Sequence, residues 1–136
     1  MKIVAAILIA GVSGATCAAD KSQLEAVSMI RLIATPEKFE SREILVRGLF
    51  RCEFENWALY LTKDDIGRFP ENAFWVTPAK GATMRYMSKV QPLAGTPCQS
   101  NGKYVTVRGR VDLRDRGHRG IFAGSLIVTE LVQEEP

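Results

Sequence analysis

Alternation of apolar and polar residues from Glu43 to Phe54 predicts a long β-strand with one buried side. Gly48 lies in the middle of the apolar face, where a missing side chain lets a strand bend sharply. The segment from Tyr104 to Leu113 repeats this pattern, with Gly109 in the matching place. Nothing around the two segments repeats, so we expect two similar bent strands and not a duplicated domain. The predicted buried face of the first strand comprises Ile44, Val46, Phe50, Cys52 and Phe54, and the opposite face Leu45, Arg47, Leu49, Arg51 and Glu53.

Shorter patterns predict the remaining elements. A tight turn at Glu55 and Asn56 leads into a return strand, and Pro78 should end the next strand. These further strands are expected at Trp57 to Thr62, Ala73 to Thr77 and Ile121 to Val132. Helical spacing occurs twice. Ser22 and Glu25 form a capping box that predicts a first helix from about Ser22 to Ala34, and Met84, Met87 and Val90 predict a short helix within Thr83 to Val90.

This order of elements indicates a mainly β protein. Five strands with a bent first member, an N-terminal helix and a short helix between strands three and four are typical of an OB-fold-like barrel. In that barrel the first strand pairs with both the second and the fourth. The alternative is an open, two-layer antiparallel sheet with helices on one side.

The N-terminus predicts export. Lys2 precedes the apolar run Ile3 to Val12, and small residues follow as far as Ala19, which is the order found in secretory signal peptides. We therefore expect a signal peptide at 1–19 and one domain at 20–136, located in the periplasm or secreted, with no transmembrane segment in the mature chain. Lipidation at Cys17 is the less favoured alternative, because the residues before it lack the large aliphatic side chain usual in lipoprotein signals.

Charge and cysteine content limit the chemistry. Removing the signal takes away one lysine and no acid, so the formal charge falls from +3 to +2, which neither requires nor excludes a basic binding surface. Cys52 and Cys98 remain in an oxidising compartment, and a disulfide between them is expected. Two cysteines without a histidine cluster cannot form a tetrahedral zinc site, so we expect no metal and no cofactor.

Several segments also resemble a group of small exported or envelope-linked bacterial proteins of unknown function. The resemblance rests on Ser28 to Phe39, Val46 to Gly48, Ala58 to Leu61 and Gly117 to Gly124, and it covers most of the mature chain. Those proteins are similar to OB-fold domains, so the resemblance implies the same fold. It implies no activity and no catalytic residues.

A basic loop is the first candidate for chemistry. OB-folds usually bind on the outer face of strands two and three, beside the loop that joins strands four and five. Here that loop carries Arg114, Arg116, His118 and Arg119, which could present donors to a phosphate, a sulfate or a sugar acid. We favour the alternative of a solvated hairpin loop. His118 has no visible partners for metal binding or for general base catalysis.

Two aromatic residues and an arginine stripe are weaker candidates. Tyr60 and Trp75 could both point outward and stack on a base or a sugar ring, although burial under the helices is favoured. An anion-binding stripe is the alternative for four arginines on adjacent strands, but pairing with Glu43, Glu53 or Asp112 is preferred. The four arginines are Arg47, Arg51, Arg108 and Arg110.

We therefore expect an exported, non-enzymatic OB-fold-like binding module for an anionic or sugar-like ligand of the cell envelope. The alternative is a structural or accessory protein that docks another envelope protein through a strand edge. A nucleic-acid partner is compatible with the charge but not favoured. An exported nuclease is a remote third hypothesis, because no cluster of metal-binding carboxylates accompanies the arginines.

Overall fold

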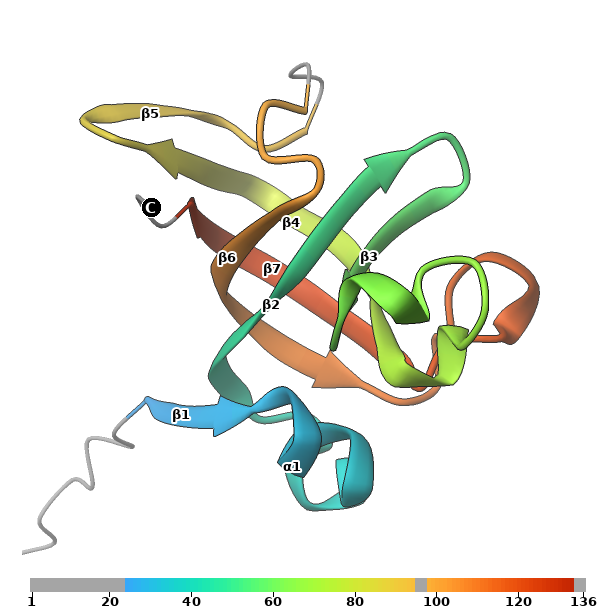
Figure 1. Cartoon of the computed structure of the whole chain (residues 1–136). Coiled ribbons are helices and arrows are strands. Elements are labelled where there is room, and N and C mark those ends of the chain that lie inside the picture. Colours follow the sequence, from blue (N-terminus) through green and yellow to red (C-terminus); the bar gives the residue numbers. More distant parts are fainter. Residues whose placement is uncertain (1–23, 95–97, 134–136) are drawn as a thin grey trace, which may run out of the picture.

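The computed structural model describes residues 24–94 and 98–133, and it is mainly β (Figure 1). The predicted signal peptide and Cys17 lie outside these residues. The strands are β1 (Glu25–Ser28), β2 (Glu43–Glu53), β3 (Asn56–Tyr60), β4 (Ala73–Tyr86), β5 (Lys89–Pro92), β6 (Lys103–Asp112) and β7 (Gly124–Gln133). The helical elements are α1 (Met29–Ala34) and the 3₁₀ turns η1 (Pro36–Phe39), η2 (Lys63–Asp65), η3 (Pro70–Asn72) and η4 (His118–Gly120).

Strand β2 has two partners along one of its sides and a third along the other. It pairs with β6 over Glu43–Phe50, while its opposite side pairs with β1 as far as Arg47 and with β3 from Leu49 onward. Gly48 lies at the change of partner, where a Cβ atom would come within 2.6 Å of Leu59 Cγ. The prediction that the first long strand pairs with both the second and the fourth is confirmed.

Five strands close a ring in the order β2, β3, β4, β7, β6 and back to β2. All neighbours in this ring are antiparallel except β4 and β7, which are parallel. Strand β1 adds to β2 and β5 adds to β4, giving a seven-stranded mixed sheet. The open antiparallel sheet considered as an alternative has neither the closing β2 to β6 pairing nor a parallel pair.

The predicted first helix is confirmed from Met29 to Ala34 and wrong from Glu25 to Ser28, while Ser22 lies outside the described residues. Residues 25–28 form β1, which runs parallel to β2, and the helix begins only at Met29. Ser28 caps it, because its Oγ accepts a hydrogen bond from the Arg31 amide at 3.2 Å. Val27 is buried by the strand pairing, whereas Ile30 is 68% exposed. Before Met29, the spacing of apolar residues therefore belongs to a strand and does not mark the buried face of a helix.

The predicted helix between the third and fourth strands is also wrong. Strand β4 continues through Pro78 to Tyr86, turns at Met87, whose φ is 53°, and returns as β5. Pro78 is tolerated because the pairing with β7 is irregular between Pro78 and Thr83. Ala82 and Met84 are buried on one side of β4, so the segment follows the period of two that a strand requires.

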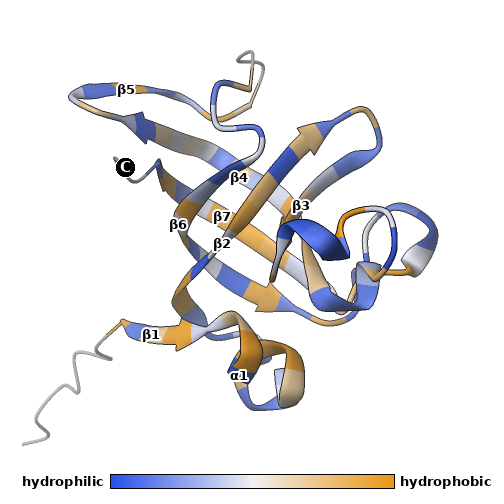
Figure 2. Ribbon diagram, in the orientation of Figure 1, coloured by the Kyte–Doolittle hydropathy of each residue, from blue (hydrophilic) through white to orange (hydrophobic). Residues whose placement is uncertain are grey.

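The main hydrophobic cluster takes side chains from every ring strand and from the N-terminal elements. Figure 2 shows hydrophobic positions along these strands and on α1. A second cluster lies on the outer face of β3 and β4. Its buried members are Leu49, Ala58, Tyr60, Ala73 and Phe122. Leu49 was expected on the polar face of β2 and is buried here. Phe54, expected on the buried face, is 90% exposed because it lies in the turn after β2.

The expected disulfide between Cys52 and Cys98 is present, with a Cα to Cα distance of 6.1 Å. Two hydrogen bonds beside the disulfide also join residues 101–102 to β2. The Cys52 amide donates to Asn101 Oδ1 at 3.1 Å, and the Gly102 amide donates to the Phe50 carbonyl at 2.8 Å. These contacts fix the connection between β5 and β6 to the end of β2.

The arginine stripe is largely paired. Arg108 makes two hydrogen bonds to Glu43, at 3.0 and 3.1 Å, and Arg51 pairs with Glu53. The Arg47 guanidinium lies 4.6 Å from the centre of the Tyr104 ring. Pairing with Glu43 and Glu53 is therefore confirmed for Arg108 and Arg51.

Candidate functional site

A cavity of about 200 Å³ lies between the β2–β3 turn, the 61–72 connection and the 113–123 loop. We call it the Tyr60 pocket. Its lining residues are Glu55, Asn56, Tyr60, Gly67, Pro70, His118, Ile121 and Phe122. The lining mixes a carboxylate, an amide, a phenol and an imidazole with apolar side chains. Three separate segments of the chain are therefore needed to build it.

The β2–β3 turn supplies the polar rim. Glu55 has a φ of 55°, in the left-handed region that favours glycine, and Asn56 begins β3. Tyr60, which is 3% exposed, donates a hydrogen bond from its hydroxyl to Asn56 Oδ1 at 3.0 Å. Both Glu55 and Asn56 of this tight turn line the pocket.

The Tyr60 phenol is neutral at physiological pH. Burial raises its pKa, and this effect outweighs the opposing hydrogen bond to Asn56 and the charge of Arg51. A neutral phenol can both donate and accept hydrogen bonds. Tyr60 is therefore suited to holding a polar group.

The 61–72 connection is shaped by the buried carboxylate of Asp65. This carboxylate accepts hydrogen bonds from the Thr62 amide at 2.9 Å, the Thr62 hydroxyl at 2.6 Å and Asn72 Nδ2 at 2.8 Å. Burial alone would raise the pKa of Asp65, but the three hydrogen bonds outweigh it and the pKa is lowered. The bonds hold the segment that carries Gly67 and Pro70. Sequence reasoning missed Asp65, although Thr62 followed three residues later by an acid is a capping signal.

The 113–123 loop folds back over the outer face of the ring. Arg116 Nε donates to the Phe122 carbonyl at 2.7 Å, and Asp115 Oδ1 accepts from the Gly117 amide at 2.9 Å. Gly117 lies so close to Trp75 that a Cβ atom there would be 2.5 Å from the indole Cγ. The Phe122 ring contacts the Tyr60 ring, at a centroid distance of 6.4 Å. The loop, and not a helix as expected, thus covers the outer face that carries Tyr60 and Trp75.

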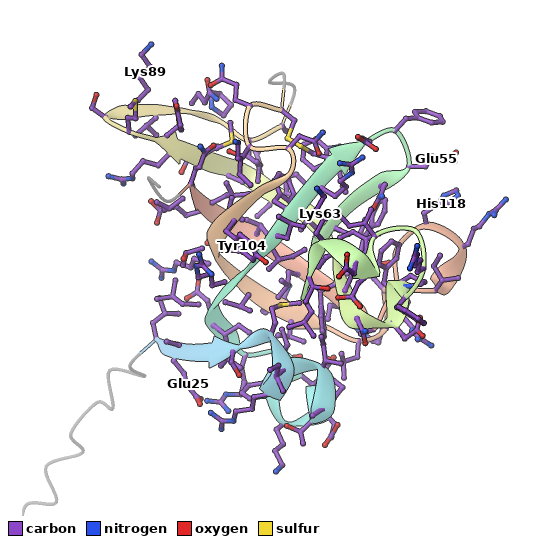
Figure 3. The ribbon with its side chains drawn as sticks, viewed as in Figure 1. Glu25, Glu55, Lys63, Lys89, Tyr104 and His118 are labelled. Atoms are coloured by element: carbon purple, nitrogen blue, oxygen red, sulfur yellow. A yellow bond between two sulfur atoms is a disulfide. The ribbon has the colours of Figure 1, made fainter. Side chains whose placement is uncertain are left out.

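The four basic residues of this loop do not converge on one point. His118 Nε2 lies 3.4 Å from Glu55 Oε2, across the mouth of the Tyr60 pocket, and Figure 3 shows both side chains on the same side of the molecule. Arg114 makes hydrogen bonds to Asp112 at 3.2 and 3.3 Å, which lower the pKa of that carboxyl group. Arg116 is tied to its own loop, and Arg119 is exposed. Anion binding by this loop stays a prediction.

Tyr60 and Trp75 border different hollows. Tyr60 lies on the outer face, as alternation implied, but it is buried beneath Phe122. Trp75 is partly exposed and borders a second hollow of about 340 Å³, which we call the tryptophan cleft. The centres of the Trp75 and Phe122 rings are 5.3 Å apart. Phe122, which sequence reasoning also missed, therefore stands between the two predicted aromatic residues.

Comparison of the chain with protein-family models, curated proteins and solved structures finds no match. Within residues 24–94 and 98–133 no helix has the length and apolar character needed to cross a bilayer. Interpretation of the site therefore depends on its geometry.

Proposed function

We propose that this protein is an exported, non-enzymatic binding module built on an OB-fold-like barrel, and that the Tyr60 pocket holds a sugar-like ligand. The ring order and the parallel β4 to β7 pair support the barrel. OB-folds bind on the face of their second and third strands, between the loops that join strands one and two and strands four and five. In this ring those strands are β3 and β4, and the pocket lies between the corresponding turn and loop.

One observation carries the proposal: a single small cavity combines two aromatic rings with polar side chains that can donate and accept hydrogen bonds. Tyr60 and Phe122 supply the rings. Glu55 accepts hydrogen bonds, and Asn56 both donates and accepts them. A sugar ring has an apolar face and hydroxyl groups at its edge, so it matches both parts. Pockets for drug-sized ligands are about 300–1,000 Å³, so this smaller cavity fits about one ring.

The charge of the pocket favours a neutral sugar over an anion. The Glu55 carboxylate at the rim would repel a phosphate or a sulfate, and the Arg114 guanidinium is paired with Asp112. Export is supported by the Cys52 to Cys98 disulfide, because disulfides persist in oxidising compartments.

Nuclear magnetic resonance tests the proposal directly. Backbone amide spectra of the mature protein would be followed during addition of glucose, galactose and N-acetylglucosamine, with inorganic phosphate and sulfate as the anion arm. We expect saturable shifts at Asn56 and His118 with at least one neutral sugar and none with the anions. His118→Ala should weaken sugar binding several-fold, whereas Arg114→Ala, in the same loop but outside the pocket, should not. Saturable shifts with the anions alone, or with none of the five, would refute the proposal.

A second candidate function, docking of another envelope protein, is favoured by the β4–β5 hairpin. The hairpin stands away from the ring (Figure 1). Among the described strands β5 pairs only with β4, so its other edge can accept a further strand. Met87 and Val90 on this hairpin are 60% and 56% exposed. Edge docking should yield a cross-linked complex that persists at about 0.5 M salt and disappears in Val90→Lys. A complex that survives this substitution would exclude the β5 edge.

A further inference from the structure

The tryptophan cleft is an apolar hollow on the far side of Phe122 from the Tyr60 pocket. Its lining residues are Trp57, Trp75, Val76, Thr77, Pro78 and Ala94. It exists because β3 pairs with β4 only as far as Trp75, while β4 continues beyond it through Thr77 and Pro78. None of the lining side chains carries a charge. Both tryptophans of the chain border this hollow.

The cleft and the Tyr60 pocket adjoin through one pair of aromatic rings. Asn56, which lines the pocket, and Trp57, which lines the cleft, are consecutive in β3, so their side chains point to opposite faces of the sheet. On the outer face, Trp75 of the cleft contacts Phe122 of the pocket, at a centroid distance of 5.3 Å. The two hollows therefore lie on either side of the Phe122 ring. A ligand longer than one ring can reach both.

We infer that the ligand is a neutral oligosaccharide, with one ring in the Tyr60 pocket and a neighbouring ring stacked in the tryptophan cleft. This inference rests on the proposed function of the pocket. Indole side chains present large flat apolar faces on which a ring can stack, and they bury a large area with little conformational freedom to lose. Hydrogen bonds in the pocket then orient the oligosaccharide, and stacking in the cleft makes a longer oligosaccharide bind more tightly than a single sugar.

The uncharged lining of the cleft favours a neutral oligosaccharide over other elongated ligands. A nucleic acid would require cationic groups along its phosphates, and the cleft supplies none from its lining residues. A proline-rich peptide also binds aromatic grooves, but it would make no use of the carboxylate and amide at the adjoining pocket. The peptide is therefore an alternative outcome of the test.

Intrinsic fluorescence tests the inference, because both tryptophans border the cleft. The mature protein would be titrated with glucose, with N-acetylglucosamine, with the β-1,4-linked tetramer of each, and with a decaproline peptide. We expect one tetramer to bind at least about tenfold more tightly than its monomer, the scale on which stacking a ring changes binding, and to shift the emission to shorter wavelength. The monomer should shift the Asn56 and His118 amides with little change in emission.

Ala94→Arg places a long side chain at the cleft without disturbing the core, since Ala94 is exposed in a loop. This variant should lose the tenfold gain and keep monomer binding. Ala26→Arg makes the same change at an exposed position of β1 and should behave as the unmodified protein. If the monomer binds in the pocket but the tetramer gains nothing, the inference is wrong and the proposed function stands. If no sugar binds, or only decaproline shifts the emission, both are wrong.

Discussion

Removing the disulfide should destabilise the protein by a predictable amount. The bond joins residues 46 positions apart and closes a loop that contains β3, β4 and β5. In the chain-entropy treatment, closing a loop of this length removes enough freedom from the unfolded chain to stabilise the fold by about 4 kcal/mol. The folded state should change little, because the hydrogen bonds from the Cys52 and Gly102 amides remain available. Most of the destabilisation is therefore expected to come from the greater conformational freedom of the unfolded chain.

Urea unfolding of a Cys52→Ala/Cys98→Ala variant measures this loss. With a slope of about 1.5–2 kcal/mol per M, typical of a small domain, the midpoint should fall by about 2 M. The corresponding decrease in Tm is about 15 °C. Reduced wild-type protein should unfold at the same urea concentration as the variant, which separates loss of the bond from any effect of the substitutions. A loss below about 1 kcal/mol, with the bond verified by mass spectrometry in the parent, would refute the entropic reasoning.

Three further predictions concern single residues. Gly48→Ala should destabilise the fold by about 2–3 kcal/mol in urea unfolding, because the new methyl group would meet Leu59 and the Tyr60 carbonyl at 2.9 Å or less. Asp65→Asn should cost about 2 kcal/mol at pH 7 and much less at pH 3. The folded-state pKa of Asp65 is lowered, so its stabilisation is complete above the ordinary value of 3.8 and is lost as the pH falls through the folded-state pKa. Glu55→Gly should weaken sugar binding while stability rises by about 0.5–1 kcal/mol in thermal unfolding, because glycine relieves the left-handed backbone.

Each of these predictions has an outcome that would contradict it. Unchanged stability in Gly48→Ala would mean that β2 and β3 are not in close contact at this point. Asp64→Asn, which changes the exposed neighbour, serves as the control for Asp65, and equal pH profiles for the two variants would rule out the buried hydrogen bonds as the cause. If Glu55→Gly lost stability as well as binding, the side chain would have a structural role.

The closed ring of strands was largely predictable from the sequence. Gly48 and Gly109 interrupt two similar apolar alternations, and the cysteine pair implied that the connection before β6 returns to the end of β2. Alternation records which face of a strand is buried, so β2 and β6 were found with their bounds nearly correct, whereas β4 was expected to end at Thr77 and runs on to Tyr86. The added strands β1 and β5 were not found. Their short apolar patterns fit three- and four-residue spacing as well as alternation, and only pairing with β2 and β4 decides between them.

The candidate site was predictable only in part. Tyr60 and His118 were named, and they line one pocket. Phe122 was missed because its burial depends on the 113–123 loop folding back, which is held by the hydrogen bond from Arg116 and by the fit of Gly117 against Trp75. Local sequence patterns do not encode contacts of this kind, since they join a loop to strands far away in the chain. Pairing of the stripe arginines with nearby acids was preferred from the sequence, but the geometry of each pair could not be obtained from it.

The closing position of β7 in the ring determines when the protein can fold. The last of the described strands lies between β4 and β6, and the partners Glu43 and Arg110 are separated by about half of the polypeptide. Such high contact order predicts folding in milliseconds to seconds, slower than for helical proteins of similar size. During synthesis the ring cannot close until β7 has emerged. A truncated product that stops before β7 would leave two strand edges exposed and should be prone to aggregation.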